Sequence, residues 1–237
     1  MKGMFLLREY TKGIKDGLPI CLGYISVSFA FGLMAKRGGL SVLSSVLISL
    51  TNLTSAGQFA GIEIIKSNGT LFELAFATLI INLRYLLMSL SLSQRFDEKT
   101  GTLKRLAMSF GITDEIFAVS MQRIAPLTFT YFIGLMTLPI IGWSGGTFLG
   151  AFASSVLPET VRLSLGIAIY AMFIAIIIPP AKKSRTILNI ILISVAISTI
   201  LSFVPLFAGL SGGWRIIIST IIASGVGAFL YPQKEGE

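Results

Sequence analysis

The chain lacks histidine and has one cysteine, Cys21, among its 237 residues. Without histidine there can be no histidine metal site, no histidine-based nucleophile activation and no histidine proton relay. A single cysteine excludes an internal disulfide and a thiolate metal cluster. The motifs GxxxxGK[ST] and HExxH are missing as well, and no serine can be paired with a histidine as nucleophile and base. We therefore predict a protein that is not an enzyme and that uses no metal or other cofactor.

Charge is also scarce. Only 13% of the residues are charged, where a soluble domain has about 25%, and 54% are hydrophobic, with a mean hydropathy of +0.84. Long apolar runs alternate with short basic clusters, which is typical of a chain that crosses a membrane several times. The net charge of +8 does not indicate nucleic acid, because the basic residues stand at the ends of apolar runs, as the positive-inside rule requires. The expected environment is a lipid bilayer.

The apolar runs predict the helices. Those long enough to cross the hydrocarbon core, about 20 residues each, are 17–35, 71–93, 160–180, 187–208 and 214–231, with 126–142 as a short sixth. Runs 107–121 and 145–158 are short and predict partial helices. Run 41–65 is interrupted by the polar stretch "TNLTSAGQ", which predicts a broken helix or a re-entrant pair. We predict an all-α, polytopic membrane bundle, a single domain over 1–237, with two discontinuous or re-entrant segments, 41–65 and 145–158.

Basic loops test the topology. If the N-terminus is cytoplasmic and 41–65 crosses once, the basic loop 94–106 lies outside, against the positive-inside rule. If 41–65 enters and leaves on one side, loops 94–106 and 181–186 and both termini are cytoplasmic, and we favour this arrangement. Trp143, Trp214 and Tyr231 stand near span ends, as in an aromatic belt.

Two halves of the chain share a pattern. "FGLMAKRGGLS" (31–41) is similar to "IGLMTLPIIGWS" (133–144), and a small-residue run containing GxxxG follows each. One explanation of this match is an internal repeat, with halves of about 13–93 and 120–180 followed by a helix pair at 187–231. The alternative is chance similarity. Paired glycine-interrupted segments are a pointer to a transporter's binding site. We therefore expect breaks near 54–58 and 145–150 that face each other near the midplane.

Polar groups inside a membrane are costly and usually face a partner or a cavity. In "TNLTSAGQFAG" (51–61), a break would expose polar groups to hold a zwitterion, and the candidates are Asn52, Ser55, Gly57 and Gln58. The alternative is a kinked packing helix in which Gln58 bonds a neighbouring backbone.

A second polar group lies in "INLRYLLMSLSLS" (81–93). Arg84 stands near the middle of its apolar run, and Asn82 lies on another face of the same helix. A buried arginine costs about 3 kcal/mol or more on insertion scales, so it needs a carboxylate, a cluster of carbonyls or an anionic substrate group. A purely structural ion pair is the alternative to a substrate-binding role.

A third group is "FGITDEIFAV" (110–119). Thr113 is a natural N-cap, and Asp114 and Glu115 then complement the positive end of a helix dipole. The same acids are the nearest candidates for the counter-charge of Arg84. One acid could stay ionised against Arg84 while the other carries a proton for transport. A two-acid catalytic site is geometrically poor, because adjacent residues on a helix point about 100° apart.

These segments in this order, "SAGQFAG", "NLRYLLMSLSLS" and "GITDEIFAV", together with 17–41 and 142–155, resemble the AzlC family over nearly the whole chain. The resemblance implies the large subunit of an exporter of hydrophobic, typically branched-chain, amino acids in the inner membrane, working with a small AzlD-like membrane subunit. Family members often have histidine where this chain has Tyr85, which excludes an imidazole role there. A non-transporting scaffold and a carrier of another small solute are the alternatives.

Overall fold

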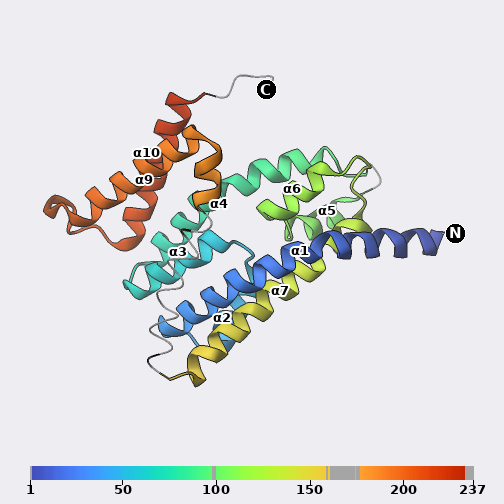
Figure 1. The fold of residues 1–237 in the computed structure, drawn as a ribbon, viewed down its shortest axis with the longest axis horizontal. Coiled ribbons are helices and arrows are strands. Elements are labelled where there is room, and N and C mark those ends of the chain that lie inside the picture. The colour runs from blue at the N-terminus through green and yellow to red at the C-terminus, as the bar shows by residue number, and fades with distance from the viewer. Residues whose placement is uncertain (1, 98–99, 159, 161–173, 175–176, 233–237) are drawn as a thin grey trace. The chain divides into compact units, whose positions relative to one another are not determined.

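The computed structural model describes residues 2–97, 100–158, 160, 174 and 177–232. Within these ranges the regular elements are helices (Figure 1), which confirms the all-α membrane bundle. Their bounds are α1 Lys2–Arg37, α2 Val42–Thr51, α3 Ser55–Lys66, α4 Leu71–Ser93, α5 Thr102–Ser109, α6 Asp114–Gln122, α7 Phe129–Val156, α9 Arg185–Phe203, η1 Pro205–Phe207 and α10 Gly212–Leu230. The predicted span 160–180 lies mostly outside the described residues.

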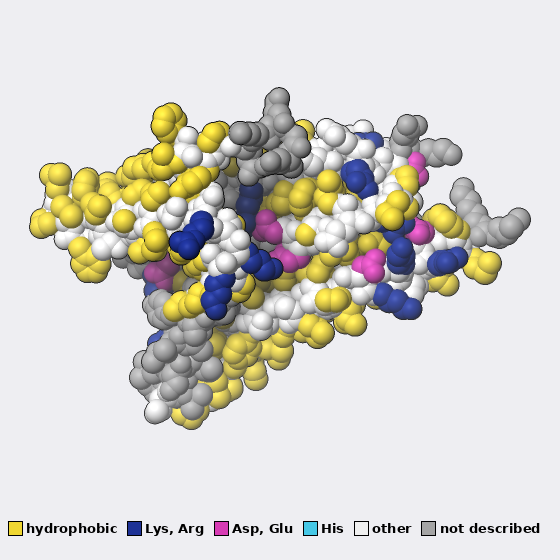
Figure 2. All heavy atoms as spheres, turned by 45° about the horizontal axis from the view of Figure 1, so that its top comes forward, with side chains coloured by type: hydrophobic (Ala, Val, Ile, Leu, Met, Phe, Trp, Pro, Cys, Tyr) yellow, Lys and Arg dark blue, Asp and Glu magenta, His cyan; other side chains and the backbone are white. Residues whose placement is uncertain are grey.

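Five of the described helices, α1, α4, α7, α9 and α10, are long and apolar enough to cross a membrane. Large apolar side chains on them are exposed, for example Leu83, Leu86, Leu87 and Leu90 on α4. Such side chains also cover much of the face drawn in Figure 2, as expected of a protein whose solvent is lipid.

The chain divides into two compact units. The first comprises the described residues up to Gln58 together with Asn82–Pro158, and the second comprises Phe59–Ile81 and the described residues after Pro158. All the candidate site residues belong to the first unit.

Two long parallel helices, α1 and α7, form the frame of the first unit. Gly134 packs on the backbone of Tyr10, and Gly150 packs on the backbone of Phe29. Because the contact positions rise together along both helices, the two run in the same direction. Added side-chain atoms at these glycines would lie 2.4 and 2.0 Å from the carbonyl oxygens of Tyr10 and Phe29, so the small residues permit the close approach.

The predicted break near 145–150 is wrong, because α7 continues without interruption from Phe129 to Val156. Runs 126–142 and 145–158 are therefore one helix. The glycines that suggested a break instead serve packing: Gly146 lies against Ile25 and Ser28 of α1, and Gly150 lies against Phe29. Trp143 is 1% exposed in the middle of α7, so it does not belong to an aromatic belt.

The predicted break in 41–65 is confirmed. Helix α2 ends at Thr51, α3 begins at Ser55, and the residues between them are not helical. The break lies deep in the unit, because Ser49 near the end of α2 bonds Thr147 of α7, with 2.7 Å between the two hydroxyl oxygens. Since α2 follows the C-terminal end of α1, it enters the first unit from the end where α1 finishes.

The second discontinuous segment lies at 102–122. Helices α5 and α6 are separated by residues 110–113, and Gly111 packs against Met136 of α7. The sequence predicts one partial helix over 107–121, and the structure interrupts it at 110–113. At the end of this interruption, Thr113 caps α6 by accepting a hydrogen bond from the Ile116 N–H.

This second pair enters from the end of the unit where α1 begins. Arg123, which follows α6, forms a 2.7 Å ion pair with Glu9 of α1, and Arg95, which follows α4, donates to the Arg123 carbonyl. At the start of α5, Arg105 donates to the Ser93 carbonyl of α4 at 3.2 Å. The basic loop after α4 therefore lies at the same end as the N-terminal part of α1, as our topology requires.

The second unit contains the helix hairpin α9–α10 and the facing parts of α3 and α4. Its small core consists of Ile64, Ala77 and Ile217, with Trp214 packed against it. The buried Glu73 is satisfied by the Thr70 N–H and the Ser211 hydroxyl, which makes it a capping residue.

Candidate functional site

The two helix breaks lie at the same level of the first unit, beside Trp143. Trp143 stands halfway along α7, and its indole N–H donates to Gln58 Oε1 of α3 at 2.8 Å. Its ring meets the ring of Tyr24 edge-on, with 5.3 Å between centroids. Leu53 of the first break and Ile112 of the second pack in the same core cluster as Trp143. Both breaks, 52–54 and 110–113, therefore border the same core cluster.

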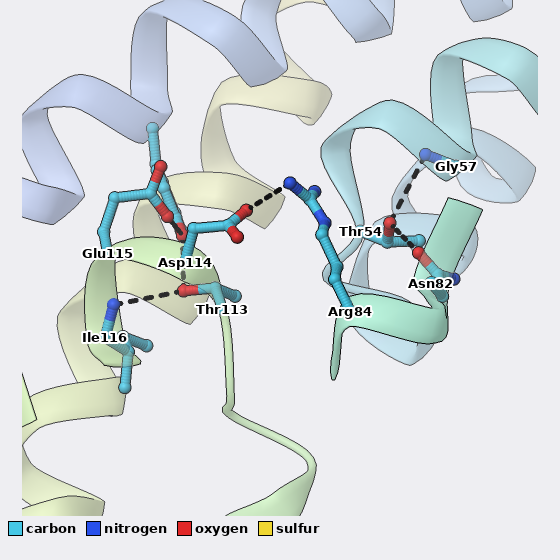
Figure 3. Close-up of polar contacts among 9 residues, drawn as sticks. Thr54, Gly57, Asn82, Arg84, Thr113, Asp114, Glu115 and Ile116 are labelled. Carbon is cyan, nitrogen blue, oxygen red and sulfur yellow. Dashed lines mark hydrogen bonds and ion pairs between the residues drawn. The ribbon is translucent and has the colours of Figure 1, made fainter. Parts of the chain in front are cut away.

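The first break is held by Thr54. Its hydroxyl donates to Asn82 Oδ1 of α4 at 2.6 Å and accepts from the Gly57 N–H at 3.3 Å (Figure 3). A side chain at Gly57 would meet the Thr54 methyl group at 2.7 Å, so glycine is needed for this turn. Asn52 and Ser55 are half-buried beside it, and Asn52 Oδ1 accepts from the Thr54 N–H at 3.4 Å.

Gln58 uses both ends of its amide within the protein. Besides accepting from Trp143, it donates from Nε2 to Ser49 Oγ at 3.0 Å, and Ser49 in turn bonds Thr147. The side chain is buried and bonds side chains of α2 and α7 instead of a neighbouring backbone. It therefore fastens the start of α3 to the frame, and a direct contact with substrate would require these bonds to open.

Arg84 and Asp114 form an ion pair between α4 and α6. The distance from Arg84 Nη1 to Asp114 Oδ2 is 2.9 Å, and the side chains are 44% and 46% exposed. In Figure 3, Arg84 extends from α4 to the start of α6, while Thr54 and Asn82 lie on its other side. The guanidinium also stacks at 5.2 Å from the centre of the Tyr85 ring. The counter-charge expected from the sequence is thus present at the level of both breaks.

Glu115 has a different partner from its neighbour. The hydroxyl of Tyr24 on α1 lies 2.5 Å from Glu115 Oε2 and 2.7 Å from Thr113 Oγ1. Adjacent helical residues point about 100° apart, so Asp114 faces α4 and Glu115 faces α1. Sequence reasoning missed Tyr24; a phenol in the middle of the first apolar run, on the face that carries Cys21 and Ser28, was the available signal.

Helix ends add to the electrostatics of this region. Helices α3 and α6 begin at the breaks, and α2 and α5 end there. Each helix start carries about half a positive charge and each helix end about half a negative charge, so the two starts and two ends cancel. Arg84, Asp114 and Glu115 then leave a net charge of about −1 when both acids are ionised. The region therefore offers both donors for a carboxylate and acceptors for an ammonium group.

A second polar cluster, also missed from the sequence, lies where α1 begins. Arg123 is 8% exposed, pairs with Glu9 and lies 3.8 Å above the centre of the Tyr131 ring, whose hydroxyl donates to Asp16 at 2.8 Å. The spacing of Glu9 and Asp16, two turns apart on one helix face, was the signal for it. Cavities of about 950 and 570 Å³ adjoin Arg123. Neither here nor elsewhere in the described ranges do three acidic or cysteine side chains gather to hold a metal ion.

Comparisons with known proteins identify the family of the chain. The family model described as AzlC protein matches residues 19–157. The chain is 30% identical over 184 residues to the inner membrane protein YgaZ of Escherichia coli, which covers 75% of each chain. It is 32% identical to an uncharacterised membrane protein of Archaeoglobus fulgidus, covering 73% of this chain and 76% of that one.

A more distant relative carries a functional name. The chain is 23% identical over 173 residues to the branched-chain amino acid transport protein AzlC of Bacillus subtilis, which covers 71% of this chain and 66% of the relative. No solved structure matches the chain significantly.

Proposed function

Since the chain belongs to the AzlC protein family, we propose that it is the large subunit of a secondary transporter that exports hydrophobic, branched-chain amino acids. The proposed setting is the inner membrane, with both termini in the cytoplasm and a small AzlD-like membrane subunit as partner. The possible halves at about 13–93 and 120–180 stay part of this proposal. The named transport protein of Bacillus subtilis supports the substrate class.

The observation that carries the proposal is the Arg84–Asp114 ion pair at the level of two helix breaks. Interrupted helices near the midplane are where secondary transporters bind substrates, because helix starts bind a carboxylate and helix ends bind cations. The proposed substrate-binding residues are Asn52, Ser55, Gly57, Gln58, Asn82 and Arg84, with Asp114 and Glu115 as the coupling acids. Apolar residues of the surrounding cluster would contact the hydrocarbon side chain.

An efflux assay tests the proposal. Cells that express the chain with its partner are loaded with a labelled valine-containing dipeptide, and release of the amino acid is followed. We expect faster release than from cells without the chain, and a large loss of this acceleration in Arg84→Gln. The control is Lys66→Gln, which removes the cation of an exposed ion pair with Glu63 in the second unit.

The alternatives give different results. A non-transporting scaffold would tolerate Arg84→Gln and would accelerate no efflux. A carrier of another solute would need Arg84 but would release none of the hydrophobic amino acids faster than the control cells. Either result would overturn the proposal.

A further inference from the structure

The Arg84–Asp114 pair is the one charged contact that crosses from α4 to the second break in the described first unit. A permanent structural pair inside a membrane protein is normally enclosed, because exposed charges in lipid are costly. This pair is instead nearly half exposed on both sides. The buried Glu9–Arg123 pair, at 13% and 8% exposure, shows what an enclosed pair looks like in the same unit.

We propose that Arg84 and Asp114 are an exchange pair for zwitterions. The two side chains bind each other when the site is empty. When an α-amino acid binds, Arg84 takes its carboxylate and Asp114 takes its ammonium group. This inference rests on the proposed transport function and assigns a recognition rule to its site.

Charge pairing explains why the ligand must carry both groups. Leaving one member of an ion pair without its counter-charge is unfavourable to the extent that the pair is shielded from water, and about half of each side chain is shielded here. A zwitterion replaces one ion pair by two and leaves no charge unpaired. A carboxylic acid without an amino group would free Asp114 with nothing to bind it, and an amine without a carboxylate would do the same to Arg84. The pair therefore selects against both half-ligands.

Geometry allows the exchange. Asp114 binds one terminal nitrogen of the guanidinium, and among the described residues no other carboxylate or carbonyl contacts Arg84. The carboxylate and ammonium of an α-amino acid are attached to the same carbon, so the two side chains need to part by only a few ångströms, within the reach of the flexible arginine stem. Met88 lies one turn further along α4, and Leu53 lies at the first break, both in partly buried apolar positions where a hydrocarbon side chain fits.

Glu115 does not compete for this role. Its carboxylate already accepts the Tyr24 hydroxyl, and the contact drawn to Arg84 in Figure 3 comes from Asp114. Only Asp114 is placed to exchange partners. The two adjacent acids are thus divided between a ligand-exchanging position and a fixed contact with α1.

The test compares three ligands on the purified chain with its partner in lipid vesicles: leucine, 4-methylpentanoate, which lacks the amino group, and 3-methylbutylamine, which lacks the carboxylate. Inhibition of labelled leucine transport gives an apparent affinity for each. For the wild type we expect both half-ligands to inhibit at least about tenfold more weakly than leucine, since a hydrogen bond to a charged group is worth roughly one to two decades in affinity.

The variant Asp114→Asn sharpens the test. Removal of the acid should weaken leucine binding by about tenfold and strengthen inhibition by 4-methylpentanoate, because Arg84 is then free without creating an unpaired carboxylate. The matched control is Glu63→Gln, which removes the acid of the exposed Lys66–Glu63 pair and should leave the ratio of the two ligands unchanged.

The failures are distinguishable. If Asp114→Asn changes both ligands by the same factor, the pair is structural and the exchange is refuted while transport stands. If the variant does not fold, the wild-type comparison decides: equal inhibition by leucine and 4-methylpentanoate overturns the exchange. If the wild type transports no hydrophobic amino acid, the proposed function falls, and this inference falls with it.

Discussion

Replacing Gly150 by alanine tests the close packing of α1 on α7. A Cβ atom at Gly150 would lie 2.0 Å from the Phe29 carbonyl oxygen and 2.8 Å from its carbonyl carbon. Ordinary C···O contacts are no shorter than about 3.3 Å, so α1 must retreat by roughly 1 Å. The obstacle is backbone and no side-chain rotation relieves it. Overpacking of this kind costs about 1–3 kcal/mol.

Gly145 provides the matched control in the same helix. A Cβ atom there meets nothing within 4 Å, so Gly145→Ala should be neutral or stabilising by up to about 1 kcal/mol through helix propensity. The two variants should therefore differ by about 1–4 kcal/mol. For a chain of this size that corresponds to roughly 2–16 °C in Tm.

The measurement is thermal unfolding of both variants and the wild type in the same detergent and at one heating rate. We expect Gly150→Ala to unfold at a lower temperature than the wild type, and Gly145→Ala at the same temperature or higher. Equal midpoints for the two variants would refute the reasoning, because they would show that α1 and α7 are not in the close contact described above.

Two further predictions concern the site and the topology. Gln58→Leu leaves the buried Trp143 N–H without an acceptor and should lower the unfolding midpoint, at a cost of about 1–3 kcal/mol per orphaned group; an unchanged midpoint and unchanged transport would contradict the anchoring role. In intact cells, a membrane-impermeant thiol reagent should label Arg37→Cys from outside and should not label Lys104→Cys. The native Cys21 is 8% exposed and should give little background labelling. Labelling of Lys104→Cys instead of Arg37→Cys would show that the topology is inverted.

The sequence was sufficient to predict the helical class, most of the spans and the break in 41–65. Hydropathy identifies a long lipid-facing helix directly, and the polar run after Thr51 marks an interruption. The second break was misplaced because glycine has two uses. At Gly146 and Gly150, glycine allows α1 to pack closely against α7, which is unbroken. This use of glycine is visible only when the residues of α1 that contact these positions are known. The real break, at 110–113, is mostly apolar and has Thr113 as its clearest signal.

The candidate site was predictable where the cost of an unpaired charge in the membrane limits which residues can be partners. Arg84 in an apolar run needs an acid, and few acids were available, so a pair with Asp114 or Glu115 followed from the sequence, and the structure assigns it to Asp114. The contact between Tyr24 and Glu115 did not, because a phenol has no comparable need for one partner, and its direction depends on how α1 packs. The network of Gln58 with Trp143 was hidden for the same reason.

The contacts of the first unit also indicate which elements form its fixed part. Helices α1 and α7 are joined along their length through small residues, and the Gln58 network fastens the first break to α7. The start of α6 is held differently, by the hydroxyl of Tyr24 and by the ion pair with Arg84. Polar contacts of this kind exchange partners at small cost when a ligand supplies equivalent groups, whereas interdigitated backbones do not. We therefore expect the α1–α7 frame to stay fixed during transport, and the start of α6 to move relative to α4 when substrate separates Arg84 from Asp114.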